Sequence, residues 1–124
     1  MPKSSKLIAM KRGKVLLVRR RVDGLWMFPG GRKRRGEDEK ACLRREIAEE
    51  LPKLKIGRVT LWREATTKNK WSGRKMSDAV FISKKASGRL DIGDTKELDK
   101  AVWRKPFRIR LTPTSRYIRD KLFS

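Results

Sequence analysis

The sequence contains no histidine and one cysteine among its 124 residues. The absence of histidine excludes imidazole catalysis and metal sites built from imidazole ligands. A single cysteine, Cys42, excludes an internal disulfide and a zinc site made of several thiolates. Such cysteine usage agrees with a reducing compartment.

Long apolar runs are also missing. The N-terminal residues Met-Pro-Lys-Ser-Ser-Lys are followed only by the short apolar run Leu7 to Met10. That run is too short for a secretory signal or a membrane span. We therefore predict a cytoplasmic protein with no membrane partner.

Acidic residues are scarce. The chain has 14 aspartates and glutamates against 35 lysines and arginines, which gives a formal net charge of +21. Such a charge attracts polyanions over a long range and loses that attraction as salt screens it, so we expect phosphorylated partners. The length and the 37% hydrophobic content fit one domain with one modest core, and we predict a single domain over residues 1–124.

Apolar patterning predicts a mixed set of elements with no internal repeat. We expect strands near residues 7–10, 15–18, 25–28, 55–65 and 76–83, a strand ending near Trp103, a helix over 38–51 and a C-terminal helix capped by Thr112. Pro29 to Gly31 should end a strand, and Pro52 should end the first helix. Residues 66–75 and 87–95 are predicted loops. The class is α+β or α/β with a mixed sheet.

Carboxylates are concentrated in one segment of this basic chain. Gly31 is followed after five residues by Glu37, and after seven more by Arg45-Glu46-Ile47-Ala48-Glu49-Glu50. Leu43, Ile47 and Leu51 give the predicted helix an apolar stripe. Three glutamates fan over about 100° of the neighbouring surface, so they can point toward one site. These are Glu46, Glu49 and Glu50.

Two interpretations of these glutamates compete. They could form a solvated helix face with Arg45 in an ordinary surface ion pair. Alternatively they bind a divalent cation, because hard cations such as Mg²⁺ prefer oxygen ligands from a rigid element and leave positions for substrate. The glycine turn and the complete spacing favour the metal site. Water attack on a phosphoanhydride needs such a cation to neutralise the phosphate oxygens.

The whole pattern resembles the signature of the Nudix hydrolase family. The residues that carry the resemblance are Gly31, Glu37, Arg45, Glu46, Ile47, Glu49 and Glu50. Residues 14–19 and 24–31 look like the strand, turn and strand that precede the signature in that family. Beyond Leu54 the likeness is only generic. The resemblance implies an α/β/α sandwich, with a mixed sheet flanked by the motif helix and a C-terminal helix.

The resemblance also implies a chemistry, namely hydrolysis of a nucleoside diphosphate linked to another group with Mg²⁺ or Mn²⁺. By likeness the metal ligands are Glu46, Glu49 and Glu50, helped by the Gly30 carbonyl oxygen and by Glu37. Arg45 is expected to contact Glu49 and to limit repulsion between the carboxylates.

The general base is expected to be a motif glutamate, such as Glu49 or Glu50, or an acid from a later loop. Glu97 is the leading loop candidate, and Glu64 and Asp78 are weaker ones that we expect to be solvated. The signature usually continues with a glycine where this chain has Pro52. The helix end must therefore be built differently, because glycine can adopt a positive φ and proline cannot.

Basic and aromatic residues suggest how a substrate is held. Four cations lie between Gly31 and Glu37 and are expected to meet phosphates; they are Arg32, Lys33, Arg34 and Arg35. Trp71 is a candidate platform for a nucleobase. A nucleoside triphosphate is the first substrate expected, ahead of dinucleoside polyphosphates, nucleotide sugars and capped RNA. The alternative is a catalytically weak module that binds RNA or DNA, and either a monomer or a homodimer is compatible with the sequence.

Overall fold

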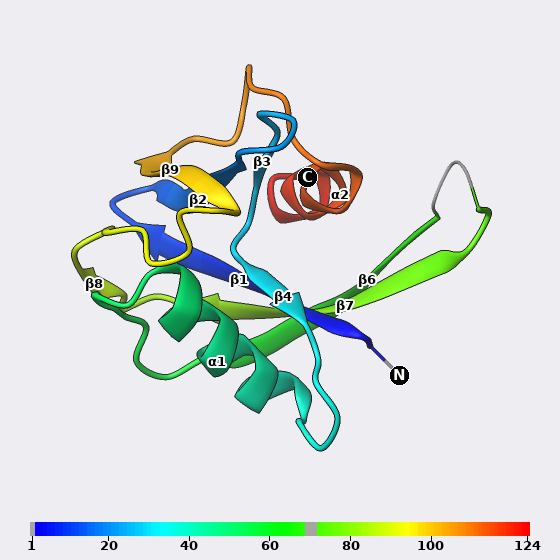
Figure 1. The fold of residues 1–124 in the computed structure, drawn as a ribbon. Helices are drawn as coiled ribbons and strands as arrows, with labels where there is room; N and C mark the ends of the chain where they lie inside the picture. The colour runs from blue at the N-terminus through cyan, green and yellow to red at the C-terminus, as the bar shows by residue number, and fades with distance from the viewer. Residues whose placement is uncertain (1, 69–71) are drawn as a thin grey trace.

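A computed structural model describes residues 2–68 and 72–124 (Figure 1). In chain order its elements are β1 (Ser4–Lys11), β2 (Lys14–Arg20), β3 (Trp26–Met27), β4 (Gly30–Arg32), α1 (Glu39–Glu50), β5 (Leu54–Lys55), β6 (Thr60–Lys68), β7 (Lys75–Ser83), β8 (Ser87–Gly88), β9 (Leu98–Arg104) and α2 (Pro113–Leu122). Neither helix of the described residues is long and apolar enough to cross a membrane.

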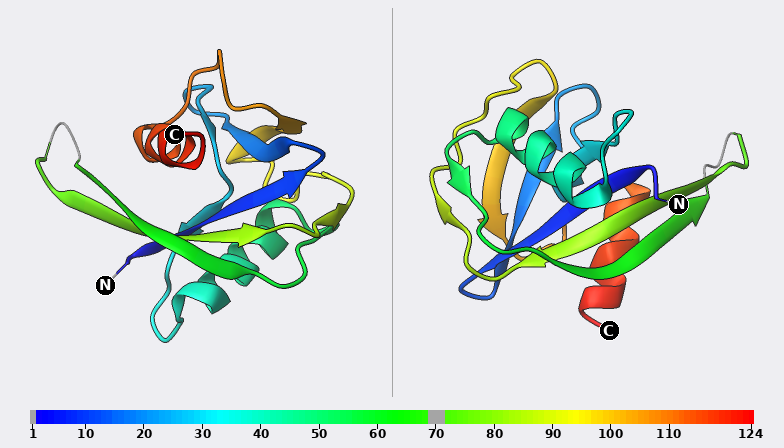
Figure 2. Two further views of the ribbon diagram at one scale, coloured as in Figure 1. Left: turned by 180° about the vertical axis from the view of Figure 1, so that it is seen from behind. Right: turned by 90° about the horizontal axis from the view of Figure 1, so that it is seen from below.

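Strand β1 lies at the centre of a mixed sheet. It runs parallel to β7 and antiparallel to β2 and β4. Strand β6 then pairs with β7, and strands β3 and β9 pair with β2, all antiparallel. Helices α1 and α2 lie on opposite sides of these strands, as the views from behind and from below show (Figure 2). The predicted α/β/α arrangement with a mixed sheet is confirmed.

Alternation along β1 divides the interior into two apolar clusters. Leu7 and Ala9 face α1 and pack with its apolar stripe of Leu43, Ile47 and Leu51. Ile8 points the other way and packs in the cluster that contains Ile118 of α2. Because successive strand residues point to opposite faces, one central strand supports both helices.

The segment from Pro29 to Gly31 does more than end a strand, which corrects the sequence prediction. Strand β3 pairs with β2 as far as Met27. The chain then forms β4, which pairs with β1 and places Gly30 opposite Lys6. Gly30 has φ +145°, and a Cβ there would lie 2.0 Å from the Ser5 carbonyl oxygen. Glycine therefore permits the close backbone approach that brings β4 beside β1.

The strand predicted over residues 55–65 is shifted. Lys55 belongs to β5, which pairs with β8, whereas β6 begins at Thr60. Strand β6 extends through Thr66 and Thr67 to Lys68, which is opposite Lys75, so part of the predicted loop 66–75 is strand. The two threonines are β-branched and suit an extended backbone even where side chains are polar.

Candidate functional site

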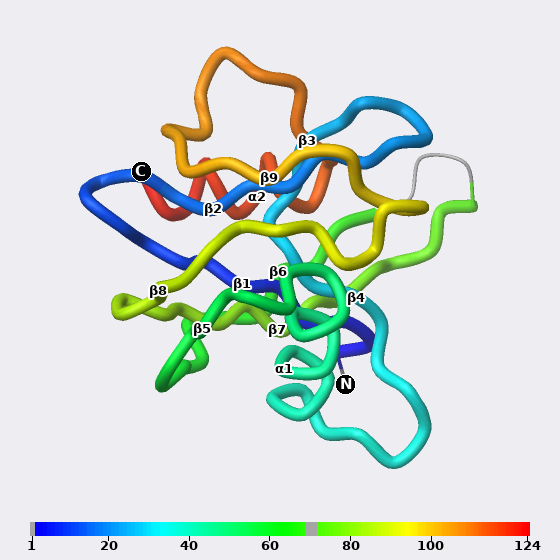
Figure 3. The backbone as a smooth tube through the Cα atoms, turned by 60° about the vertical axis from the view of Figure 1, so that its left-hand side comes forward, coloured from blue at the N-terminus to red at the C-terminus, as the bar shows by residue number. Residues whose placement is uncertain are grey.

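Helix α1 is held at both ends by neighbouring groups. At its start the Asp38 side chain accepts a hydrogen bond from the Ala41 amide at 2.7 Å. At its end the Leu51 amide donates to the Ile47 carbonyl oxygen at 2.8 Å, and the Gly93 amide donates to the Glu50 carbonyl oxygen at 2.9 Å. A neighbouring segment therefore satisfies a helix carbonyl, which explains how Pro52 is accommodated without a glycine cap. Figure 3 follows the chain from β4 into this helix.

The Arg45 guanidinium binds three carboxylates of the motif. It donates to both oxygens of Glu37, from Nε at 2.5 Å and from Nη2 at 2.9 Å. Its Nη1 donates to Glu46 at 2.9 Å and lies 3.4 Å from both oxygens of Glu49. The contact predicted between Arg45 and Glu49 is confirmed. The hydrogen bonds from Arg45 lower the pKa of Glu37 to about 2, and the Arg34 amide adds to this shift.

Gly31 makes room for one of these carboxylates. A Cβ on Gly31 would lie 2.4 to 2.7 Å from the carboxylate atoms of Glu46. Any other residue would push the Glu46 carboxylate away from β4. Gly31 thus determines where the Glu46 carboxylate can lie.

Glu50 lies in a different environment. Its residue is 6% exposed, and one carboxylate oxygen accepts a hydrogen bond from the Gly30 amide at 3.1 Å. Burial raises the pKa of Glu50 to about 8, and the negative charges of Glu46 and Asp94 act in the same direction. The positive charge of Lys6 and the Gly30 amide oppose the rise. A buried carboxylate of this kind is stabilised in its charged form by a cation placed beside it.

A cleft of about 540 Å³ begins at Gly31 and Arg32 of the motif. Gly31 and Arg32 line it, together with Lys6 from β1, Asp78 from β7 and Thr112 at the start of α2. This volume lies in the range usual for small-molecule sites. The cleft therefore joins the motif to a mixed set of donors and acceptors.

Asp78 is buried at 3% exposure, which corrects the prediction that it is solvated. Burial raises the pKa of Asp78, and the charge of Lys6 lowers it. The positive charge of Lys6 also opposes the rise in the pKa of Glu50, so this lysine acts on both acids. Glu64 is exposed, as predicted. Sequence reasoning missed Lys6, whose one visible signal is a charged residue directly before an apolar strand.

The four predicted phosphate-binding cations have different surroundings. Arg32 is exposed and lines the cleft. Lys33 forms a salt bridge with Glu39 at 3.1 Å, and Arg34 forms one with Glu49 at 3.4 Å. Arg35 is exposed. The predicted base platform Trp71 lies outside the described residues.

The loop before β9 contains another acid, Asp94, besides the predicted Glu97. Glu97 is exposed, and its amide donates to the carbonyl oxygen and side chain of Asp94. The charge of Asp94, in contrast, acts on Glu50. The sequence did not indicate Asp94. Its position next to Gly93, whose amide donates to the Glu50 carbonyl oxygen at the end of α1, is visible only in the fold.

The donor set fits a hard cation. Within residues 2–68 and 72–124, no three acidic or cysteine side chains are already grouped as metal ligands. Arg45 lies among the carboxylates that would form such a group. All candidate donors are oxygens, which hard cations prefer. The buried Glu50 carboxylate accepts a hydrogen bond from the Gly30 amide. A metal ion bound here would replace Arg45 as the positive partner of Glu46 and Glu49.

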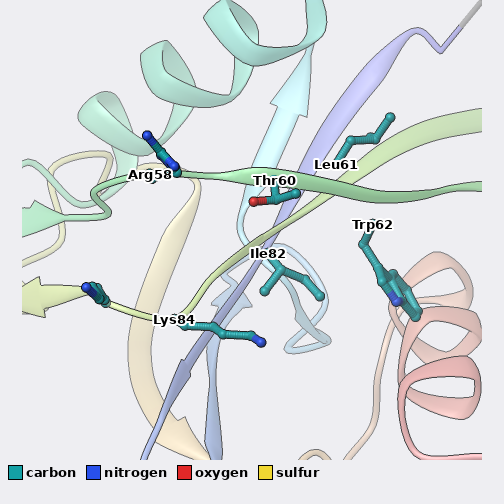
Figure 4. A pocket seen from close by; sticks show the side chains of 7 residues that line it. Arg58, Thr60, Leu61, Trp62, Ile82 and Lys84 are labelled. Carbon is teal, nitrogen blue, oxygen red and sulfur yellow. The ribbon is translucent and has the colours of Figure 1, made fainter.

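A second cavity, of about 510 Å³, lies away from the motif and is shown in Figure 4. Its lining contains Trp62, Ile82 and three cations, and no carboxylate. The cations are Arg58, Lys84 and Lys85. Because three cations and no carboxylate are among its described lining residues, it does not meet the needs of a magnesium site.

The sheet, the two helices and the glycine-to-glutamate site define a class of phosphoanhydride hydrolases. A family model described as the NUDIX domain matches residues 4–122. The chain therefore belongs to the Nudix hydrolase family, and it is an enzyme of the pyrophosphohydrolase type.

Solved structures support the same fold. A MutT Nudix hydrolase from Burkholderia pseudomallei superposes with a TM-score of 0.86 at 22% identity, covering 98% of each chain. The E. coli ORF135 protein gives 0.68 at 25% identity, over 90% of this chain and 80% of its own. A UDP-X diphosphatase gives 0.70 at 18% identity, over 98% of this chain and 60% of its own. A search among curated proteins returns no significant match.

Proposed function

We propose that the protein hydrolyses a phosphoanhydride bond in a nucleoside triphosphate or related nucleotide with Mg²⁺ or Mn²⁺. The position of the cleft carries this proposal. Gly31 lines the cleft and also lies against the carboxylate of Glu46, while Gly30 donates to Glu50. We therefore place the polyphosphate at the edge of the cleft formed by these glycines, next to the carboxylates that they contact.

Glu46, Glu49, Glu50 and the Gly30 carbonyl oxygen are the proposed ligands. A bound cation neutralises phosphate oxygens and lowers the pKa of a water molecule. Glu37 is assigned to positioning, because both its oxygens are occupied by Arg45. Arg45 in turn holds Glu46 and Glu49 in place before the cation binds.

The proposed proton acceptor is Glu49, the most exposed of the three carboxylates that Arg45 binds. The Glu49 side chain is 44% exposed, so a water molecule can reach it. Glu97 remains the proposed alternative from the loop before β9. A general base must reach its proton within one hydrogen bond or through one water, and an exposed acid near the bound phosphates can meet that requirement.

The inner cleft is proposed to hold the nucleoside. Asp78 offers acceptors, Lys6 and Thr112 offer donors, and Met27 offers an apolar contact. Arg20 and Arg32, which also line the cleft, are proposed to bind phosphates. Trp71 and the remaining basic residues of the motif, Lys33, Arg34 and Arg35, are proposed to add contacts to the substrate.

The test is release of phosphate or pyrophosphate from a nucleotide panel in Mg²⁺, Mn²⁺ or EDTA. The panel contains ordinary and oxidised nucleoside triphosphates, dinucleoside polyphosphates, nucleotide sugars and capped RNA. Glu49→Gln and Glu50→Gln should lose turnover. Glu64→Gln, a change at an exposed glutamate of β6, should keep it.

The competing proposal is a Nudix module that binds RNA or DNA in place of turnover. Its support is the net charge of +21, whereas the complete carboxylate set opposes it. No metal-dependent turnover on any panel member, together with salt-sensitive nucleic-acid binding that survives both glutamine substitutions, would overturn the enzymatic proposal.

A further inference from the structure

We propose that a groove on the α2 side of β9 binds single-stranded nucleic acid at a site separate from the nucleotide cleft. The groove has a volume of about 650 Å³. Five cations line it, and the other three lining residues are Trp26, Val102 and Phe107. The cations are Lys14, Lys100, Arg104, Lys105 and Arg108. Among the residues that the structure describes, no carboxylate lines the groove. The proposal does not depend on the proposed hydrolysis.

The pleat of β9 places cations along one face. Ala101 and Trp103 pack against the apolar cluster on the α1 side, so the alternate residues point to the opposite face. Those residues are Lys100, Val102 and Arg104. Lys100 and Arg104 therefore lie about 13 Å apart along the strand, with the apolar Val102 between them.

Helix α2 leaves this face of β9 open, because it packs against β6 and β3. The segment that follows β9 supplies Lys105, Phe107 and Arg108 to the groove wall instead, and its far end returns beside β3 (Figure 3). Arg104 fixes its start by donating to the carbonyl oxygens of Lys105 at 3.1 Å and Phe107 at 3.2 Å. The backbone of Trp26 fixes its end through the Arg110 carbonyl and the Thr112 amide. A wall held in this way needs little ordering when a ligand binds.

The groove keeps its positive charge. Among the described residues, Lys14, Lys100, Lys105 and Arg108 form no salt bridge within 4.0 Å of a carboxylate. The neighbouring acid, Asp99, is held by Arg19 through two hydrogen bonds of 2.8 and 2.9 Å. A polyanion in the groove therefore meets no opposing carboxylate on its walls.

Aromatic side chains favour nucleic acid over other polyanions. Phe107 is 44% exposed and Trp26 is half-buried, and both line the groove. Cationic grooves with aromatic surfaces bind single strands by combining phosphate contacts with base stacking. The cavity of Figure 4 is the competing basic site. It has three lining cations, against five in the groove.

The first test measures anisotropy of a labelled oligothymidylate of about 12 nucleotides, within the usual range of site sizes. Binding is followed against NaCl concentration in EDTA, so nucleotide turnover has no part in the result. The double variant Lys100→Gln/Lys105→Gln should weaken binding and reduce the slope of log K against log salt by about 1.4, or about 0.7 for each cation.

Two control pairs remove the same charge elsewhere and should leave the slope unchanged. They are Lys84→Gln/Lys85→Gln, in the competing cavity, and Lys53→Gln/Lys55→Gln, at exposed positions outside both sites. An equal loss in all three pairs would mean diffuse attraction, and a loss confined to the Lys84 and Lys85 pair would place binding in the other cavity. Either result, or no loss at all, overturns the proposal.

A second test separates nucleic acid from other polyanions. Inorganic polyphosphate of matched charge should compete less well than unlabelled oligonucleotide, because it has no bases to stack. Phe107→Leu keeps an apolar contact for Phe123 and should weaken oligonucleotide binding while leaving polyphosphate binding unchanged. Circular dichroism melting confirms that each variant is folded. Equal competition by polyphosphate, or no effect of Phe107→Leu, contradicts the assignment to nucleic acid.

Discussion

The Arg45 side and the Glu50 side of helix α1 hold negative charge in opposite ways. On the first side, one guanidinium binds Glu37, Glu46 and Glu49, whose side chains are partly exposed. On the second, Glu50 is buried; among the described residues the Gly30 amide donates to its carboxylate, and the positive charge of Lys6 lowers its pKa. Arg45 therefore arranges its carboxylates before any cation binds, whereas Glu50 depends on a proton or a cation for compensation.

The largest expected effect comes from Glu50→Gln. Turnover with Mg²⁺ should fall by about 10²–10⁴-fold, the range found when a group that acts directly on the reacting atoms is lost. Melting in EDTA at pH 8 should nevertheless occur at a higher temperature than in wild type. Glutamine avoids the burial of a charge and can still accept the bond from Gly30. Steady-state kinetics and thermal melting give the two values.

Retained turnover in Glu50→Gln would exclude Glu50 as a ligand. A lower melting temperature in EDTA would mean that its charge is already compensated. Glu64→Gln, at an exposed position, controls for the loss of one negative charge and should change neither measurement.

Gly31→Ala should act next most strongly. Its Cβ would overlap the Glu46 carboxylate, so the apparent affinity for Mg²⁺ should fall by about 10–100-fold, as for groups that orient metal ligands. Activity measured against Mg²⁺ concentration reports this change. Gly36→Ala is the matched control, because it strains a φ of +84° but places its Cβ in open space. Equal loss of Mg²⁺ affinity in both variants would contradict the role given to Gly31.

Arg45→Lys should separate the two sides of the helix. Lysine cannot make the two parallel bonds to Glu37, and it leaves Glu46 and Glu49 less neutralised. The melting temperature should fall more in EDTA than in Mg²⁺, because a bound cation restores positive charge among the carboxylates. Melting curves under both conditions measure the difference. Equal falls would show that Arg45 acts on the fold as a whole and not on the metal-free site.

The two sides should also respond oppositely to pH. The pKa of Glu50 is raised from 4.5 to about 8, so the folded state binds its proton more tightly and stability in EDTA falls as pH rises from about 4.5 to 8. The pKa of Glu37 is lowered from 4.5 to about 2, so its contribution is lost as pH falls through that interval.

Melting temperatures measured across pH in EDTA give a curve with an acidic limb, where stability falls toward low pH, and an alkaline limb, where it falls toward high pH. Glu50→Gln should flatten the alkaline limb, and Glu37→Gln should flatten the acidic limb. If Glu50→Gln flattened the acidic limb, or Glu37→Gln the alkaline limb, the assignment of the two limbs to these residues would be wrong.

The sequence predicted features set by local spacing. The helix, its apolar stripe and the Arg45–Glu49 contact follow from the 3.6-residue period, and the end of the helix before Pro52 follows from backbone geometry. The glycine turn was predicted, whereas its pairing with β1 was not. Family spacing named the carboxylates without showing that Arg45 occupies the space among them.

Features that depend on distant strand pairings were not predicted. Asp78 is buried because β7 pairs in parallel with β1, which places it opposite Ser4. The influence of Lys6 on Glu50 depends on β4 crossing to β1. The groove on β9 needs the pairing of β9 with β2 and the segment 105–111 above it. None of these pairings has a period that is visible in one stretch of sequence.

The smallest expected effect distinguishes two acids of the loop before β9. The negative charge of Asp94 helps to raise the pKa of Glu50, although burial is the larger cause. Asp94→Asn should therefore move the alkaline loss of stability slightly toward lower pH, and its amide oxygen can still accept the Glu97 amide. Glu97→Gln should leave that midpoint unchanged because Glu97 is exposed. Melting in EDTA against pH resolves the shift.

Turnover measured on the same two variants then assigns the role of each acid. A large loss of kcat in Glu97→Gln, with kcat kept in Asp94→Asn, makes Glu97 the general base and leaves Asp94 acting only through its charge. A loss of kcat confined to Asp94→Asn makes Asp94 the proton acceptor. Unchanged kcat in both variants leaves Glu49, on the Arg45 side, as the base.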